Sequence, residues 1–195
     1  MLQFIFFLSG FAAILYQLVW QRALFTLYGT SSESVTVVVT VFMLGLGLGS
    51  LAGGALSRLA RVRQPLAFAA LEACIGGCGL VSLQVFQWIA GLTQGAAGLA
   101  VGLPAFGVLL LPTLCMGATL PLLSAYAIGG SGNVGRSVGA LYFVNTLGSA
   151  AGCALAALFV FGALGQQGAV WLAVAVNLVI AAWVLAATLR KAPLQ

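Results

Sequence analysis

The chain contains the stretch LGSLAGGAL at residues 48–56 and repeats it as LGSAAGCAL at residues 147–155. Seven of the nine positions are identical, and both copies lie in long apolar segments. Internal repeats in membrane proteins are typical of transporters that are built from two related halves. The pair therefore predicts two related halves, about residues 1–92 and 98–195, although a chain so rich in Gly, Ala and Leu could also produce it by coincidence.

The composition of the 195 residues is that of a protein embedded in a lipid bilayer. Hydrophobic residues make up 63% of the chain and charged residues 5%, and the mean hydropathy is +1.18. Such a chain cannot cover itself with a wetted surface, so we expect one integral membrane domain, residues 1–195. The formal charge of +5 falls in short loops, which argues against a nucleic-acid partner. Two acids and no histidine argue against an enzyme, and no cofactor is expected.

The long apolar runs predict an all-α protein with six transmembrane spans, because a helix needs roughly 20 residues to cross about 30 Å of hydrocarbon. We expect the amino-terminal run to be the first span rather than a signal peptide, since it is long and has no basic leader. The spans are Leu2–Leu27, Ser34–Arg58, Pro65–Ile89, Leu99–Ala125, Val134–Leu164 and Gly168–Leu189.

The basic residues orient these spans, because cytoplasmic loops carry an excess of Lys and Arg. With both termini in the cytoplasm, six of the seven basic residues lie inside: Arg58, Arg61, Arg63, Arg136, Arg190 and Lys191. We therefore predict a multi-pass protein of the bacterial inner (plasma) membrane. The two copies of the repeat then fall in spans two and five, which run in opposite directions, so the predicted architecture is a 3+3 inverted repeat.

Five motifs carry a resemblance to a known family. They occur in order along nearly the whole chain: FLSGFAA at 7–13, YQLVWQR at 16–22, FMLGLGLGS at 42–50, MGATLP at 116–121 and GALYFVNTLG at 139–148. With these motifs the chain resembles the spermidine synthase-like membrane proteins. The resemblance implies a six-helix module related to one half of a major facilitator superfamily transporter, which many relatives carry fused to a soluble aminopropyltransferase-like domain.

The sequence departs from the pattern of that family in two respects. No Gly-rich turn follows a strand, so we do not expect the activity of the soluble enzyme here. Gln17 stands where relatives often have an acid. The segment GGALSR at 53–58 resembles the facilitator signature between spans two and three, but Ser57 replaces its acid. A basic loop that only fixes the topology explains this segment as well.

Glu72 is the residue most suggestive of transport. It lies inside span three, where an acid costs about 2.5–3.5 kcal/mol at the membrane centre on insertion scales and normally faces a cavity or a partner. A proton-coupling or cation-binding role is one interpretation. The other is a structural acid that is neutral or paired with an inner-loop arginine.

Six polar residues are candidates for solute binding: Tyr16, Gln17, Arg22, Thr119, Tyr142 and Asn145. Tyr16 and Gln17 lie too deep in span one to reach either interface, and the facilitator resemblance implies that spans one and four border the cavity. Arg22 could instead reach the outer headgroups. The residues of spans four and five could equally join helices by hydrogen bonds worth about 0.6–2 kcal/mol each.

Five glycines recur at four-residue intervals on two helices: Gly45, Gly49, Gly53, Gly148 and Gly152. Small residues at this spacing allow close backbone approach. Because a lone half-facilitator leaves these faces uncovered, we expect them to form a homodimer interface, unless they pack within one chain. Cys74 and Cys78 also lie one turn apart, but the sequence near them offers no further ligand, so no metal is expected.

These observations favour a homodimeric half-facilitator that moves a small solute by alternating access. Two units would rock around a cavity lined by spans one and four. A cationic, polyamine-like solute is suggested only by the enzyme fused to the relatives. The alternative is a non-transporting membrane anchor that recruits a soluble aminopropyltransferase-like enzyme through its basic inner loops.

Overall fold

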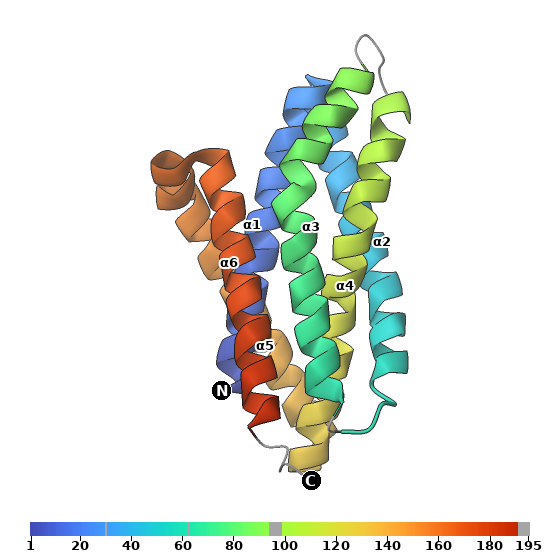
Figure 1. Cartoon of the computed structure of the whole chain (residues 1–195), viewed down its shortest axis with the longest axis vertical. Helices are drawn as coiled ribbons and strands as arrows, with labels where there is room; N and C mark the ends of the chain where they lie inside the picture. Colours follow the sequence, from blue (N-terminus) through green and yellow to red (C-terminus); the bar gives the residue numbers. More distant parts are fainter. Residues whose placement is uncertain (30, 62, 94–98, 191–195) are drawn as a thin grey trace.

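The computed structural model describes residues 1–29, 31–61, 63–93 and 99–190. These residues are almost entirely helical and contain no strand, as the sequence predicts. The elements are α1 (Leu2–Tyr28), α2 (Ser31–Leu56), α3 (Gln64–Leu92), α4 (Leu99–Ser131), α5 (Val134–Leu155), the π-helix η1 (Ala156–Val160) and α6 (Phe161–Leu189). The start of α1 and the end of α6 lie at one end of the bundle, here named the terminal end (Figure 1). The opposite end is named the far end.

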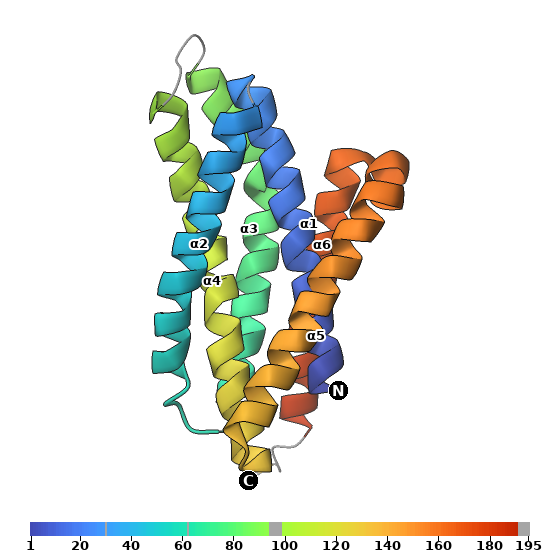
Figure 2. The same cartoon turned by 180° about the vertical axis from the view of Figure 1, so that it is seen from behind.

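Five stretches of the described chain are long and apolar enough to cross a membrane. The last of them, Val134–Leu189, contains α5, η1 and α6. Its backbone leaves helical geometry at Gly165, where φ is 66° and ψ is −171°. Figures 1 and 2 show that α5 and α6 run in opposite directions on either side of this point. The chain thus has the structure of a multi-pass membrane protein.

Glycine determines where three of the helical segments reverse. Gly29, Gly132 and Gly165 have φ values of 69°, 68° and 66°, in the left-handed region that glycine enters without steric strain. The predicted end of the fourth span at Ala125 is too early, because α4 continues to Ser131 and stops only at the left-handed Gly132.

The helices form three closely packed pairs: α2 with α4, α1 with α5, and α3 with α6. Smaller contacts join α3 to α4 and α1 to α6. Figure 2 shows α2 and α5 on the near side of the bundle, with α3 and α6 behind them. Each of the three pairs thus joins one of the first three helices to one of the last three.

Aromatic side chains of α1 fill the centre of the bundle. Tyr16 and Trp20 are buried and stacked, with ring centroids 5.0 Å apart, and Trp20 also contacts Phe42 of α2 at 6.0 Å. The outer surface carries many large apolar side chains, including Leu51 and Phe143. In water such a surface would associate, whereas in a bilayer it contacts lipid.

The glycines of the two predicted dimer faces lie at helix contacts inside the chain. A side chain at Gly49 or Gly53 would collide with the backbone of α4, and one at Gly148 would collide with the backbone of α1. Gly45 and Gly152 lie against the same two helices. The prediction that these five glycines form a homodimer interface is therefore wrong. Their faces are already covered by α4 and α1, because the missing side chains allow these helices to approach within one chain.

Candidate functional site

Glu72 lies at the junction of three helices and is completely buried. The Ser9 hydroxyl, from α1, donates a hydrogen bond to its Oε1 at 2.7 Å, and the Asn177 amide, from α6, donates to its Oε2 at 2.5 Å. α3 positions the carboxyl group between these donors. The hydrogen bonds of this carboxyl group therefore connect α1 and α3, from the first half of the sequence, with α6, from the second half.

The surroundings of this carboxyl group are apolar and its hydrogen-bond partners are uncharged. Phe6, Phe68 and Ile180 are fully buried in the same part of the bundle. Ser9 and Asn177, rather than an inner-loop arginine, are the partners of this carboxyl group in the described part of the chain. An ionised carboxylate is expensive in such a place, so the two hydrogen bonds are needed to satisfy this buried polar group.

Three buried polar atoms of α1 and α6 have no hydrogen-bond partner among the described residues. They are Asn177 Oδ1, the Tyr16 hydroxyl and Trp20 Nε1. Tyr16 lies two turns from Ser9 on α1 and contacts Gly79, two turns from Glu72 on α3. An unpartnered buried polar group costs about 1–3 kcal/mol and calls for an explanation. Tyr16 therefore adds a second buried polar side chain to the α1–α3 contact, two turns from Glu72.

The structure does not gather the six predicted solute-binding residues into one site. Tyr16 is buried in the core, and Gln17 is half-buried on α1. Tyr142 is 63% exposed on the outer surface of α5. Arg22 is also exposed, with its guanidinium 3.9 Å from the ring centroid of Phe161, which agrees better with an interfacial position than with a cavity.

Thr119 and Asn145 each donate a hydrogen bond to a backbone carbonyl. The Thr119 hydroxyl donates to the Met116 carbonyl of its own helix at 2.7 Å. The Asn145 amide donates to the Phe6 carbonyl at 3.1 Å and so links α5 to α1. Asn145 therefore has the helix-joining role that the sequence left open as the alternative, whereas the Thr119 hydrogen bond stays within α4.

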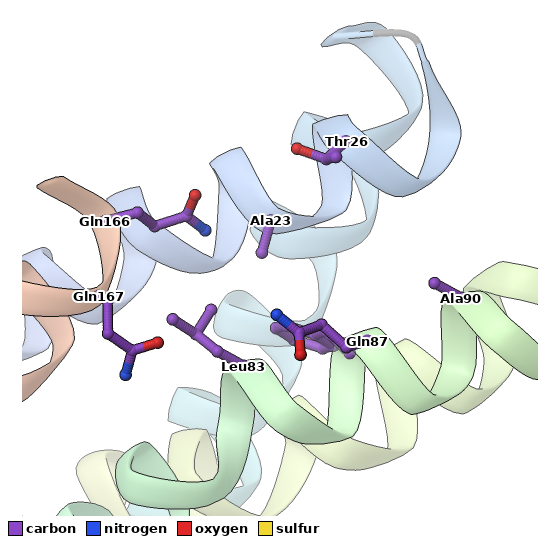
Figure 3. A pocket seen from close by; sticks show the side chains of 8 residues that line it. Ala23, Thr26, Leu83, Gln87, Ala90, Gln166 and Gln167 are labelled. Carbon is purple, nitrogen blue, oxygen red and sulfur yellow. The ribbon is translucent and has the colours of Figure 1, made fainter.

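A pocket of about 290 Å³ opens in the far half of the bundle, between α1, α3 and the start of α6 (Figure 3). Its lining residues are uncharged: Ala23, Thr26, Leu83, Phe86, Gln87, Ala90, Gln166 and Gln167. We name it the amide pocket. Figure 3 shows Gln87, Gln166 and Gln167 around the space, and Gln166 Nε2 donates to the Val19 carbonyl at 3.2 Å. Its volume is near the lower end of the ~300–1,000 Å³ typical of small-molecule sites.

Sequence reasoning missed the three glutamines. Gln166 and Gln167 follow the left-handed Gly165, and Gln87 lies within a helix that is otherwise largely apolar. A pair of amides at the reversal between two apolar helices is the signal that could have been used. Their convergence with Gln87 depends on how α3 packs against α6, which no local pattern specifies.

Arg61 contacts the end of α4 at the terminal end of the bundle. Its Nη1 donates to the Gly129 carbonyl at 2.6 Å, and its guanidinium lies 5.3 Å from the ring centroid of Tyr126. The interaction connects the segment after α2 to the last turns of α4, where a cation complements the helix dipole. Thus the basic loop that follows GGALSR also contacts the end of α4 through Arg61.

The structure adds a third cysteine to the pair expected from sequence. Cys115 Sγ of α4 lies 3.6 Å from Cys74 Sγ of α3, and Cys78 is one turn further along α3. All four cysteines are free. No group of three metal-ligating side chains suited to a metal ion occurs in the described ranges.

Comparison with protein-family models, with curated proteins and with solved structures gave no match for this chain. The resemblance to the spermidine synthase-like membrane proteins therefore stays a prediction from the motifs.

Proposed function

We propose that the chain is a membrane transporter related to half of a facilitator, with a 3+3 inverted repeat, and that Glu72 couples transport to protons. The observation that carries this proposal is a buried carboxyl group held by Ser9 and Asn177, uncharged donors from two other helices. Acids inside membrane segments commonly serve proton relays. Proton uptake by Glu72 would turn an acceptor oxygen into a donor, so its bonds would rearrange and loosen the contact of α1, α3 and α6.

Equivalent glycine contacts in the two halves support the repeat. Gly49 lies against the Leu114 carbonyl, and Gly148, its partner in the repeated motif, lies against the Phe7 carbonyl. Gly10 of α1 lies against the Asn145 carbonyl. Three further residues extend the correspondence: Gly117 of α4 lies against the Leu46 carbonyl, and Gly53 and Gly152 meet Ala118 and Phe11 in the same way. In each of the three pairs of contacts, adding 99 to the residue number on α2 gives the equivalent residue on α5. Adding 107 to the residue number on α1 gives the equivalent residue on α4.

Burial follows the same correspondence. An offset of 105 relates seven buried positions of α3 to seven buried positions of α6. These are Gln64, Phe68, Ala69, Glu72, Ile75, Gly76 and Gly79, with Ala169, Ala173, Val174, Asn177, Ile180, Ala181 and Val184. Glu72 and Asn177 are then equivalent residues that touch each other, as residues on the axis between two repeats would. Coupling sites of inverted-repeat transporters lie at this interface.

Contacts at both ends of the bundle fit alternating access. At the terminal end Arg61, after α2, binds the end of α4 at Gly129. At the far end Arg22, near the end of α1, lies over Phe161, after η1. Each contact joins the segment after the second helix of one half to the first helix of the other half. Opening one of them at a time would expose the bundle interior to one side of the membrane.

The orientation is tested by cysteine labelling in intact cells. In a Cys153→Ala background, we expect a membrane-impermeant maleimide to label Ser32→Cys, at the far end, and to reach Ala60→Cys, at the terminal end, only after permeabilisation. The reason is that the arginines after α2 favour the cytoplasm. Labelling of Ala60→Cys alone in intact cells would reverse the proposed orientation.

Flux measurements distinguish transport from anchoring. Proteoliposomes loaded with a pH-sensitive dye should report proton movement when a transported solute is added on one side. The anchor alternative is favoured by arginines at helix ends that lie at the terminal end (Figure 1): Arg58 follows α2, Arg63 precedes α3 and Arg136 lies in the first turn of α5. It predicts no solute-dependent proton movement, together with stable co-purification of a soluble aminopropyltransferase-like enzyme.

A homodimer also stays a proposal, and the oligomeric state in lipid tests it.

A further inference from the structure

The amide pocket offers hydrogen bonds but no charge. Gln87, Gln166 and Gln167 surround it with carboxamide groups, each of which has a donor nitrogen and an acceptor oxygen. Thr26 adds a hydroxyl group. The buried side chains of Leu83 and Phe86 provide an apolar wall. A ligand that matches this lining has an apolar body and paired donors and acceptors.

The distribution of acids argues against a cation in this pocket. The chain has only two acidic residues. Glu72 is buried with both oxygens bonded elsewhere, and Glu33 lies in the first turn of α2. Neither lines the pocket, so a polyamine bound there would lose its hydration without gaining a counter-charge. An anion would meet the same difficulty, because no basic residue lines the pocket either.

We infer that the amide pocket binds a small uncharged solute that carries a primary amide, or a similar donor–acceptor group, on an apolar body. The pocket and Glu72 share the contact of α1, α3 and α6. Leu83 lies 11 residues beyond Glu72 on α3, which is about 16 Å at ~1.5 Å per helical residue. Tyr16 and Gly79 lie between them. That the bound solute is also the transported one rests on the proposed function, whereas the binding itself does not.

Three probes of one shape but different charge test the inference. Nicotinamide is neutral and has a primary amide, nicotinate is an anion, and 1-methylnicotinamide is a cation. Binding is measured by equilibrium dialysis against the full chain in lipid nanodiscs, with empty nanodiscs as the reference. We expect nicotinamide to bind at least about tenfold more tightly than either ion, a difference equal to about 1.4 kcal/mol.

Two pocket variants and one matched control locate the binding. Gln87→Leu and Gln167→Leu keep the side-chain size and remove the amide, and each should weaken nicotinamide binding about tenfold. Gln84→Leu is the control, because Gln84 is exposed on the same helix and does not line the pocket. Equal effects of all three variants would overturn the inference, as would absence of nicotinamide binding or equal binding of the charged probes. Intact binding with no flux would instead contradict transport alone.

Discussion

Replacing Glu72 by Gln is expected to reduce pH-driven solute uptake to the level of protein-free liposomes. The glutamine has nearly the same shape and keeps an oxygen that can accept the Ser9 hydrogen bond, but it cannot take up or release a proton. The protein should stay folded, because the substitution keeps the shape of the side chain and introduces no buried charge. Uptake under an imposed pH gradient and thermal unfolding in detergent measure the two effects.

Glu33→Gln is the matched control for this experiment. Glu33 is the other acid of the chain, and it is exposed in the first turn of α2. We expect this variant to keep pH-driven uptake, since its charge interacts with a helix terminus and lies outside the contact of α1, α3 and α6. Normal uptake by Glu72→Gln, or equal loss in both variants, would end the proposal that Glu72 couples transport to protons.

The membrane helices could be predicted from sequence because lipid imposes one local rule on them. An apolar run that crosses lipid must form its backbone hydrogen bonds within the run, so it forms a helix. Gly29 and Gly132 mark the ends of two such helices. Glu72 could likewise be selected from its chemistry, since a lone acid in a span is costly wherever it points. These features depend on short segments and on the bilayer.

The partners of these residues could not be predicted, because they depend on which helices meet. Ser9 and Asn177 are 63 and 105 residues from Glu72. The glycine motifs specify a close approach but not the neighbour, which is why a second copy was expected where α4 and α1 are found. The amide pocket was missed for the same reason, since it forms from residues of three helices.

Leucine in place of Gly49 or Gly148 is expected to destabilise the protein strongly and to a similar extent at both positions. Overpacking typically costs about 1–3 kcal/mol, and here we expect at least the upper value, because the obstacle is a backbone carbonyl rather than a flexible side chain. The helices would have to separate to admit the new side chain. Unfolding free energies from denaturant titration in mixed micelles measure the loss.

Gly47→Leu and Gly139→Leu are matched controls on the same two helices. No described atom outside the helix backbone lies within 4 Å of a Cβ built at either position, so leucine there should cost little and would improve helix propensity. The comparison between the two test sites carries the structural argument. If α2 and α5 are equivalent members of inverted halves, their glycines meet equivalent carbonyls and must respond alike. A large loss for Gly49→Leu with none for Gly148→Leu would mean that the two contacts are unrelated, and the 3+3 architecture would fail with them.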